Sequence, residues 1–179
     1  LTFGVHVATK EAVDQVGVED PPFELSPGEI EVLGLPYGGP KGGKDSDGQF
    51  FSPSTDFMDG VIETPAVMYT HGTQNGFEPE LVGTIKGKRY DRRGGWYKVQ
   101  LDQNSSRYVQ LQESYQSGKL RASTGVVPAS FAVNEGTGHI DSWLVGELSL
   151  VDMADGYQPI NGYAITKADN VIFDNYYGD

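Results

Sequence analysis

Three residues that lie far apart in the sequence, His71, Ser123 and Glu147, are of the types that together perform acyl transfer. A serine hydroxyl is a weak nucleophile and needs an adjacent base to take its proton. Histidine suits that task because it titrates near neutrality, and a carboxylate can orient the ring and stabilise its charged form. These residue types therefore permit a serine–histidine–glutamate triad, although no Gly-x-Ser-x-Gly motif surrounds Ser123.

Ser123 is predicted to lie where a helix gives way to a strand. Asn104 or Ser105 is placed to cap a run with apolar and aromatic residues at helical spacing, and Gly118 is placed to end it. The residues that follow Ser123 are apolar and β-prone. A small neighbour, Gly125, would let another part of the chain approach closely.

Glu147 falls within a predicted strand that is apolar on both faces and is therefore expected to be buried on both. An unpaired carboxylate in such a place would be strongly destabilising, so Glu147 needs a partner. A histidine is one candidate. A salt bridge to arginine or lysine, or a strand edge that is open to water, are the alternatives.

His71 is one of three histidines and follows the apolar stretch 67–70, at a predicted strand end where loops gather. His139, which comes after a Gly-Thr-Gly turn, is a second candidate for the base. His6 lies in the N-terminal segment. Since the three histidines show no metal-ligand spacing, we expect neither a metal site nor a cofactor.

The composition excludes several function classes. A net charge of −12 argues against nonspecific binding to nucleic acid or to an anionic membrane, because both require clustered Lys and Arg. The absence of cysteine excludes disulfides, zinc–thiolate sites and cysteine nucleophiles. No apolar run approaches the length of about 20 residues that a membrane span needs. The chain begins at Leu1 without a signal-like segment, and we expect a soluble, intracellular protein.

Turn residues and apolar periodicity divide the chain into a mostly β domain, barrel or sandwich, with one substantial helix. We expect strands at 29–35, 61–70, 81–89, 95–102, 122–127 and 139–151, and the helix between 104 and 118. The segment 36–55 is expected to be a long loop, and 91–94 a hairpin turn. The predicted organisation is an extended arm over 1–28, one domain over 29–164 and a tail over 165–179.

Four segments of the chain resemble, in their order and spacing, segments of a known family. They are Val32-Leu33-Gly34-Leu35 with Asp47-Gly48-Gln49 and Phe50-Phe51-Ser52-Pro53 after it, Tyr69-Thr70-His71-Gly72, Leu120-Arg121-Ala122-Ser123-Thr124-Gly125-Val126 after the helix, and Trp143-Leu144-Val145-Gly146-Glu147-Leu148-Ser149-Leu150-Val151. In this order they resemble the tailed-phage prohead (capsid maturation) serine proteases, whose fold is similar to that of the herpesvirus assembly protease. The last segment looks like the family's Glu-x-Ser-Leu-Val signature.

This resemblance implies an antiparallel β-barrel of the herpesvirus-protease type, with the helix before the nucleophile strand. It implies that Ser123 is the nucleophile, His71 the general base and Glu147 its support. Backbone N–H groups near Ser123 and Gly125 would be the oxyanion donors. No cofactor or metal is implied.

The resemblance also implies a setting for the reaction. The substrates would be the scaffolding segment of the major capsid protein and the protease itself, which suggests autoproteolysis and a possible homo-oligomer. The enzyme would work inside the immature phage prohead in the host cytoplasm, without nucleic-acid or membrane partners. Three positions depart from the family pattern: Gly72 replaces a common aspartate, Thr124 replaces an aliphatic residue, and the segment 151–155 lacks the usual proline.

Two other functions fit the same sequence. A catalytically silent β-barrel scaffold or capsid-assembly component would keep the fold and use the two terminal segments to hold partners. A carbohydrate-binding β-sandwich would use Tyr90, Trp96, Tyr97 and Trp143 as a stacking platform, although core packing explains such aromatics more simply.

Overall fold

The computed structural model describes residues 19–39, 42–45, 47–70 and 80–155. Its elements are β1 (Glu29–Pro36), β2 (Ala66–Tyr69), β3 (Leu81–Asp91), β4 (Gly94–Leu101), α2 (Tyr108–Gln116), β5 (Leu120–Val133), β6 (Ile140–Asp152) and the short 3-10 helix η2 (Met153–Asp155). Among these residues, none of the helices has the length and apolar character that crossing a membrane requires.

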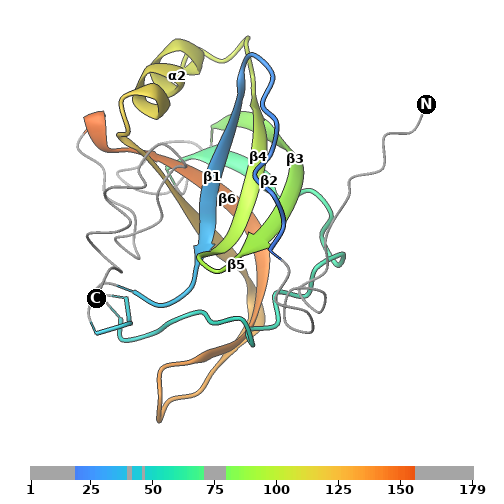
Figure 1. The fold of residues 1–179 in the computed structure, drawn as a ribbon, viewed down its shortest axis with the longest axis vertical. Helices are drawn as coiled ribbons and strands as arrows, with labels where there is room; N and C mark the ends of the chain where they lie inside the picture. The colour runs from blue at the N-terminus through green and yellow to red at the C-terminus, as the bar shows by residue number, and fades with distance from the viewer. Residues whose placement is uncertain (1–18, 40–41, 46, 71–79, 156–179) are drawn as a thin grey trace.

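All six strands join one sheet in the order β1-β4-β3-β2-β6-β5, which curls into a half-barrel (Figure 1). The two edge strands, β1 and β5, contact each other across the curl. The described chain is therefore mostly β with a single α-helix, as the sequence predicts. The expectation of an antiparallel sheet needs correction, because β2 and β6 pair in parallel. Parallel neighbours need a long crossover, and here β3, β4, α2 and β5 provide it.

The core fills the inside of the half-barrel with the apolar side chains of every strand. The alternation in β4 is the clearest case, since Tyr97, Val99 and Leu101 are buried while Lys98 and Gln100 are half-buried on the other face. β1 is instead buried along nearly its whole length, because its outer face is also covered. Both patterns follow from the period of two along a strand.

The hairpin between β3 and β4 forms at the predicted turn. Asp91 pairs with Gly94 across it, and the side chain of Asp91 accepts a hydrogen bond from the N–H of Arg93 at 2.8 Å. Gly94 has a φ of 139°, and a Cβ on this residue would collide with the carbonyl of Leu35 in β1. Glycine is therefore required where β1 lies against the turn.

The strand expected over 61–70 and the helix expected from Asn104 or Ser105 both begin later than predicted. The strand expected over 61–70 is reduced to Ala66–Tyr69, because residues 59–64 form a turn and bends and Pro65 lies just before the strand, where proline is tolerated. The helix begins only at Tyr108, with Arg107 at the N-cap. Ser105 accepts a hydrogen bond from the N–H of Arg107 and so stabilises a preceding turn instead of capping the helix. Gly118 ends the helical region as predicted, with a φ of 72°.

β5 and β6 form a long hairpin that extends past the rest of the sheet, at the end opposite α2 (Figure 1). β5 continues six residues beyond its predicted end at Val127, with register shifts and a positive φ at Ala129. The described part of 37–55 contains no strand, which agrees with the expected loop, but isolated bridges join Tyr37 to Phe51 within it and Phe50 to His139 of the β5–β6 hairpin. Arm residues 1–18 and all residues from 156 onward lie outside the described chain.

A buried arginine connects three strands of the half-barrel. Arg89 in β3 is 3 % exposed, and its Nε donates to Glu31 of β1 at 2.5 Å while its Nη1 donates to Asp91 at 3.0 Å. The guanidinium lies 4.9 Å from the ring of Trp96 in β4. The pairing and the ring offset part of the cost of removing the arginine from water, while its Nη2 is buried without a hydrogen-bond partner in the described structure.

Replacing Arg89 with methionine should destabilise the fold by about 3–5 kcal/mol, because the carboxylate of Glu31 would remain buried without its cation. Chemical unfolding followed by circular dichroism would measure the change. Arg92→Met is the matched control, since Arg92 is exposed in the same hairpin and should change stability by less than about 0.5 kcal/mol. Equal changes in the free energy of unfolding for the two substitutions would show that the buried Arg89 network does not stabilise the fold more than an exposed arginine does.

Candidate active site

Ser123 lies near the start of β5, directly opposite Ser149 of β6. Both serines are buried, with 3 % and 0 % of their surface exposed. The adjacent residues Ala122 and Leu150 belong to the hydrophobic core, and successive side chains of a strand point to opposite faces. Ser123 and Ser149 therefore share the face of the sheet that looks away from the core.

Glu147 lies on that same face, two residues before Ser149 in β6 and opposite Gly125 of β5. Its carboxylate rests against the bare backbone of Gly125, so closely that a Cβ there would collide with Oε1. The hydroxyl of Ser149 donates a hydrogen bond to Oε2 at 2.5 Å. The partner that the sequence requires for Glu147 is thus supplied in part by a serine, which the sequence analysis did not consider.

The strand that leads toward His71 is the neighbour of β6. β2 pairs with β6 in parallel, with Ala66 opposite Glu147 and Met68 opposite Ser149. After β2, the N–H of Thr70 donates to the carbonyl of Leu150 at 3.0 Å. His71 itself lies outside the described residues, which resume at Glu80. Two members of the predicted triad are therefore brought together, and the third stays a prediction.

The predicted oxyanion donors, the N–H groups of Ser123 and Gly125, belong to residues of the β5–β6 ladder. The register shifts between Gly125 and Val126, so the ladder is irregular immediately after the glycine. Such irregularities bend a strand and disturb its regular hydrogen bonding. The role of these two N–H groups stays a prediction.

His139, the second candidate base, does not belong to this site. It precedes β6 and lies eight residues from Glu147, a span of about 26 Å along an extended strand. Its ring contacts Ser52 and Asp141 instead. The described residues also contain no group of three or more histidine, aspartate or glutamate side chains that could hold a metal ion.

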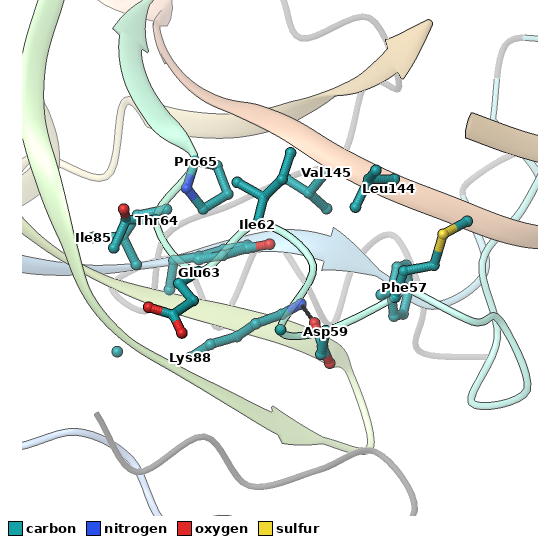
Figure 2. A pocket seen from close by; sticks show the side chains of 14 residues that line it. Phe57, Asp59, Ile62, Glu63, Thr64, Pro65, Ile85, Lys88, Leu144 and Val145 are labelled. Atoms are coloured by element: carbon teal, nitrogen blue, oxygen red, sulfur yellow. Dashed lines mark hydrogen bonds and ion pairs between the residues drawn. The ribbon is translucent and has the colours of Figure 1, made fainter. Parts of the chain in front are cut away.

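A separate cavity of about 480 Å³ lies inside the half-barrel, on the core side of the sheet (Figure 2). Its wall is mostly apolar and includes Phe57, Pro65 and Val145. One charged pair borders it, Lys88 with Asp59. Burial lowers the pKa of the Lys88 ammonium, although Asp59 opposes that shift.

Two tyrosines near this cavity differ in how their hydroxyls are paired. The hydroxyl of Tyr90 donates to Asp59 at 2.5 Å, and burial followed by the Asp59 carboxylate raises the pKa of Tyr90, which keeps it a donor. The hydroxyl of Tyr97 is buried without a hydrogen-bond partner in the described structure. Burial likewise raises the pKa of Tyr97. The cavity wall therefore holds one unsatisfied polar group.

The proposed sugar-stacking platform is not supported by these positions. Tyr90, Trp96 and Tyr97 are at most 2 % exposed, so their ring faces are not accessible to a glycan. Trp143 is half-buried and packs against Phe51, with the ring centroids 5.4 Å apart. These aromatics act as core residues, as the simpler explanation predicts.

Comparisons of this chain with protein-family models, with curated proteins and with solved structures give no match. The geometry of the described residues is therefore the evidence on which a function must be argued.

Tyr97→Phe should leave stability unchanged or raise it by about 1 kcal/mol, because it removes a buried hydroxyl that has no partner. Tyr90→Phe is its matched comparison and should cost about 1.5–3 kcal/mol, since it removes a hydrogen bond to a charged carboxylate. Unfolding in urea would measure both changes. A loss at Tyr97 as large as that at Tyr90 would mean that the Tyr97 hydroxyl is paired in solution.

Proposed function

We propose that this chain is a serine endopeptidase in which Ser123 is the nucleophile, His71 the general base and Glu147 the carboxylate that orients it. The observation that carries the proposal is the shared face of Ser123 and Glu147 on adjacent strands. Diagonal neighbours in a regular antiparallel ladder lie about 7–8 Å apart. That separation leaves room for an imidazole ring between the hydroxyl and the carboxylate.

The position of β2 supports the same assignment. Because β2 runs parallel to β6 beside Glu147 and Ser149, the chain leaves the sheet next to the strand that carries the carboxylate. The hydrogen bond from the N–H of Thr70 to the carbonyl of Leu150 keeps the chain beside β6 up to the residue before His71. This described segment of the chain therefore ends, one residue before His71, beside the strand that carries Glu147.

The mechanism follows from these roles. The Oγ of Ser123 attacks the carbonyl carbon of the scissile peptide while His71 takes the hydroxyl proton. His71 then gives that proton to the leaving amine as the peptide C–N bond breaks, and an acyl ester remains on Ser123. Water, deprotonated by His71, hydrolyses this ester and releases the free serine.

Ser149 has a positioning role in this scheme. Its hydrogen bond to Oε2 fixes one side of the Glu147 carboxylate, and the backbone of Gly125 bounds the other side. A carboxylate held in one orientation can in turn hold the imidazole in one tautomer. Gly125 is required in this arrangement because any side chain would displace Glu147.

The biological setting that we propose comes from the resemblance to prohead maturation proteases. The substrates are the scaffolding segment of the capsid protein and the protease itself, and cleavage takes place inside the immature shell. The half-barrel would then correspond to the β-barrel of herpesvirus-type assembly proteases. Self-association is part of this proposal.

Ser123→Ala should abolish self-trimming, with a rate at least about 10³-fold below that of the parent chain, because the nucleophile is lost. Intact mass followed over time would measure it, with Ser130→Ala of the same strand as the control that keeps the parent rate. Trimming of the Ser123→Ala chain at the parent rate would contradict the assignment. If no chain trims and a fluorophosphonate leaves Ser123 unlabelled, the silent assembly component becomes the better explanation.

Glu147→Gln tests the carboxylate without changing its shape. The amide oxygen can still accept the Ser149 hydrogen bond, so the free energy of unfolding should change by less than about 1 kcal/mol. The self-trimming rate should fall by about 100-fold or more, because the histidine loses the charge that stabilises its protonated form. A folded Glu147→Gln chain that trims at the parent rate would reduce Glu147 to a structural role.

A further inference from the structure

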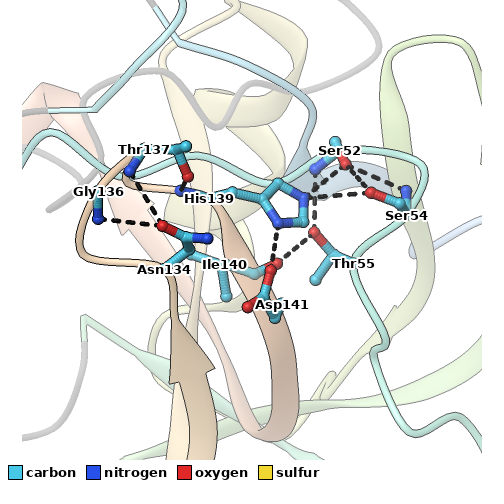
Figure 3. Close-up of polar contacts among 9 residues, drawn as sticks. All are labelled: Ser52, Ser54, Thr55, Asn134, Gly136, Thr137, His139, Ile140 and Asp141. Atoms are coloured by element: carbon cyan, nitrogen blue, oxygen red, sulfur yellow. Dashed lines mark hydrogen bonds and ion pairs between the residues drawn. The ribbon is translucent and has the colours of Figure 1, made fainter.

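A second serine, remote from Ser123, is linked to a histidine and a carboxylate by hydrogen bonds. The Oγ of Ser52 lies 2.7 Å from Nε2 of His139, and Nδ1 of His139 lies 2.6 Å from Oδ1 of Asp141. Figure 3 shows the imidazole between these two partners. The chain of contacts has the order that serine nucleophiles use, hydroxyl to imidazole to carboxylate.

The carboxylate determines the roles of the two ring nitrogens. An ionised Asp141 can only accept a hydrogen bond, so Nδ1 of His139 carries a proton and donates to it. In the neutral ring, Nε2 then has its lone pair free to accept the hydroxyl proton of Ser52. His139 is therefore oriented as a general base toward Ser52.

The oxygen of Ser52 also accepts hydrogen bonds that favour a developing negative charge. The N–H of Ser54 donates to it at 3.1 Å, and the hydroxyl of Ser54 lies 2.7 Å away. When Ser52 donates its proton to Nε2 of His139, the Ser54 hydroxyl is the donor between the two serines; Ser54 Oγ lies farther from Nε2, at 3.3 Å against 2.7 Å for Ser52. Donors to an oxygen that loses its proton stabilise the charged form.

The backbone holds these side chains on two segments that are fixed to each other. Phe50 and Asp56 form bridges with His139 and Ser142, so the loop is anchored on both sides of Ser52. Thr55 adds a side-chain bond, with its Oγ1 donating to the carbonyl of Ile140 at 2.7 Å. A nucleophile and a base on such a support keep their relative geometry.

The site is accessible to small molecules. The side chain of Asp141 is 55 % exposed and that of His139 is 18 % exposed, and Ser52 is half-buried. The nucleophile, base and carboxylate are thus all partly open to solvent. Ser123, by contrast, is 3 % exposed.

The surrounding N–H groups limit the chemistry. Those of Ser52, Ser54 and Thr55 already donate to Thr55 Oγ1, Ser52 Oγ and the Ser52 carbonyl. None of these three N–H groups is free to bind an oxyanion. They therefore cannot stabilise the negatively charged transition state, which is the largest contribution to peptide cleavage. Esters with a good leaving group depend less on that stabilisation.

We propose that Ser52 is a second reactive serine, activated by His139 and Asp141, that accepts acyl groups from small activated esters. The Oγ of Ser52 forms a bond to the acyl carbon while its proton passes to Nε2 of His139. The bond from the acyl carbon to the leaving oxygen then breaks, and His139 returns the proton to the leaving alcohol. The product is an ester on Ser52. Water can then attack the acyl carbon while His139 takes a proton from it, and His139 returns this proton to Oγ of Ser52 as the ester bond breaks and the carboxylic acid leaves.

The test uses p-nitrophenyl acetate with the full Ser123→Ala chain, so that its result is independent of the proposed protease site. Tandem mass spectrometry should locate the acetyl group on Ser52. His139→Gln should lower the acetylation rate of Ser52 by about 100-fold, the contribution of a positioned general base. Ser130→Ala in the same background is the control and should leave the rate unchanged.

Asp141→Asn removes the negative charge beside His139 but keeps the shape of the side chain, and it should lower the acetylation rate of Ser52 by about tenfold or more. This second variant is needed in case His139→Gln also disrupts the contacts between His139 and the loop. Thermal unfolding checks that each variant is folded. Three outcomes would overturn the proposal. Two are acetylation at Ser54 alone and no acetylation of Ser52. The third is an equal rate of Ser52 acetylation in the folded Ser123→Ala chain and in its His139→Gln and Asp141→Asn variants.

Discussion

The register of β5 against β6 is the constraint on which both candidate sites depend. It sets Ser123 opposite Ser149 and Glu147 against Gly125, and at the far end it brings His139 and Asp141 beside the loop that carries Ser52. A slip of one residue would move Ser123 to the core side and expel Ala122 from the core. Because both faces are buried near the start of β5, such a slip is energetically excluded, and the register is strongly specified.

The four residues of β2 have a comparable importance for the whole sheet. They join two antiparallel parts of the sheet, β1-β4-β3 and β6-β5. β2 pairs with β3 in the antiparallel direction and with β6 in the parallel direction. This arrangement brings a strand from the first half of the sequence beside Glu147. The proposed protease site thus depends on a short strand whose pairing is set by neighbours on both sides.

Local sequence signals predicted the parts of this fold that local chemistry decides. The turn from Asp91 to Gly94 and the positive φ of Gly118 each follow from the properties of one or two residues. The Glu-x-Ser spacing places Glu147 and Ser149 on one face of β6, yet Ser149 was not predicted as a partner of the carboxylate. The parallel pairing of β2 was missed because it joins segments about 80 residues apart and leaves no periodic trace. Ser52 and His139 were missed as a pair for the same reason, since a loop without periodicity carries the serine 87 residues before the histidine.

The two serines have opposite combinations of access and support. Ser123 is buried in a ladder between strands, and exclusion of water is a condition that favours difficult reactions such as peptide cleavage. Ser52 has an oriented base and an open surface, but the backbone donors around it are already used within its own turn. Both sites touch β6, yet about 26 Å of strand separates Glu147 from His139, and groups so far apart perturb each other little. If both proposals hold, a serine-directed reagent reacts at two independent places in this chain, so only the position of the label, not its presence, bears on the function of Ser123.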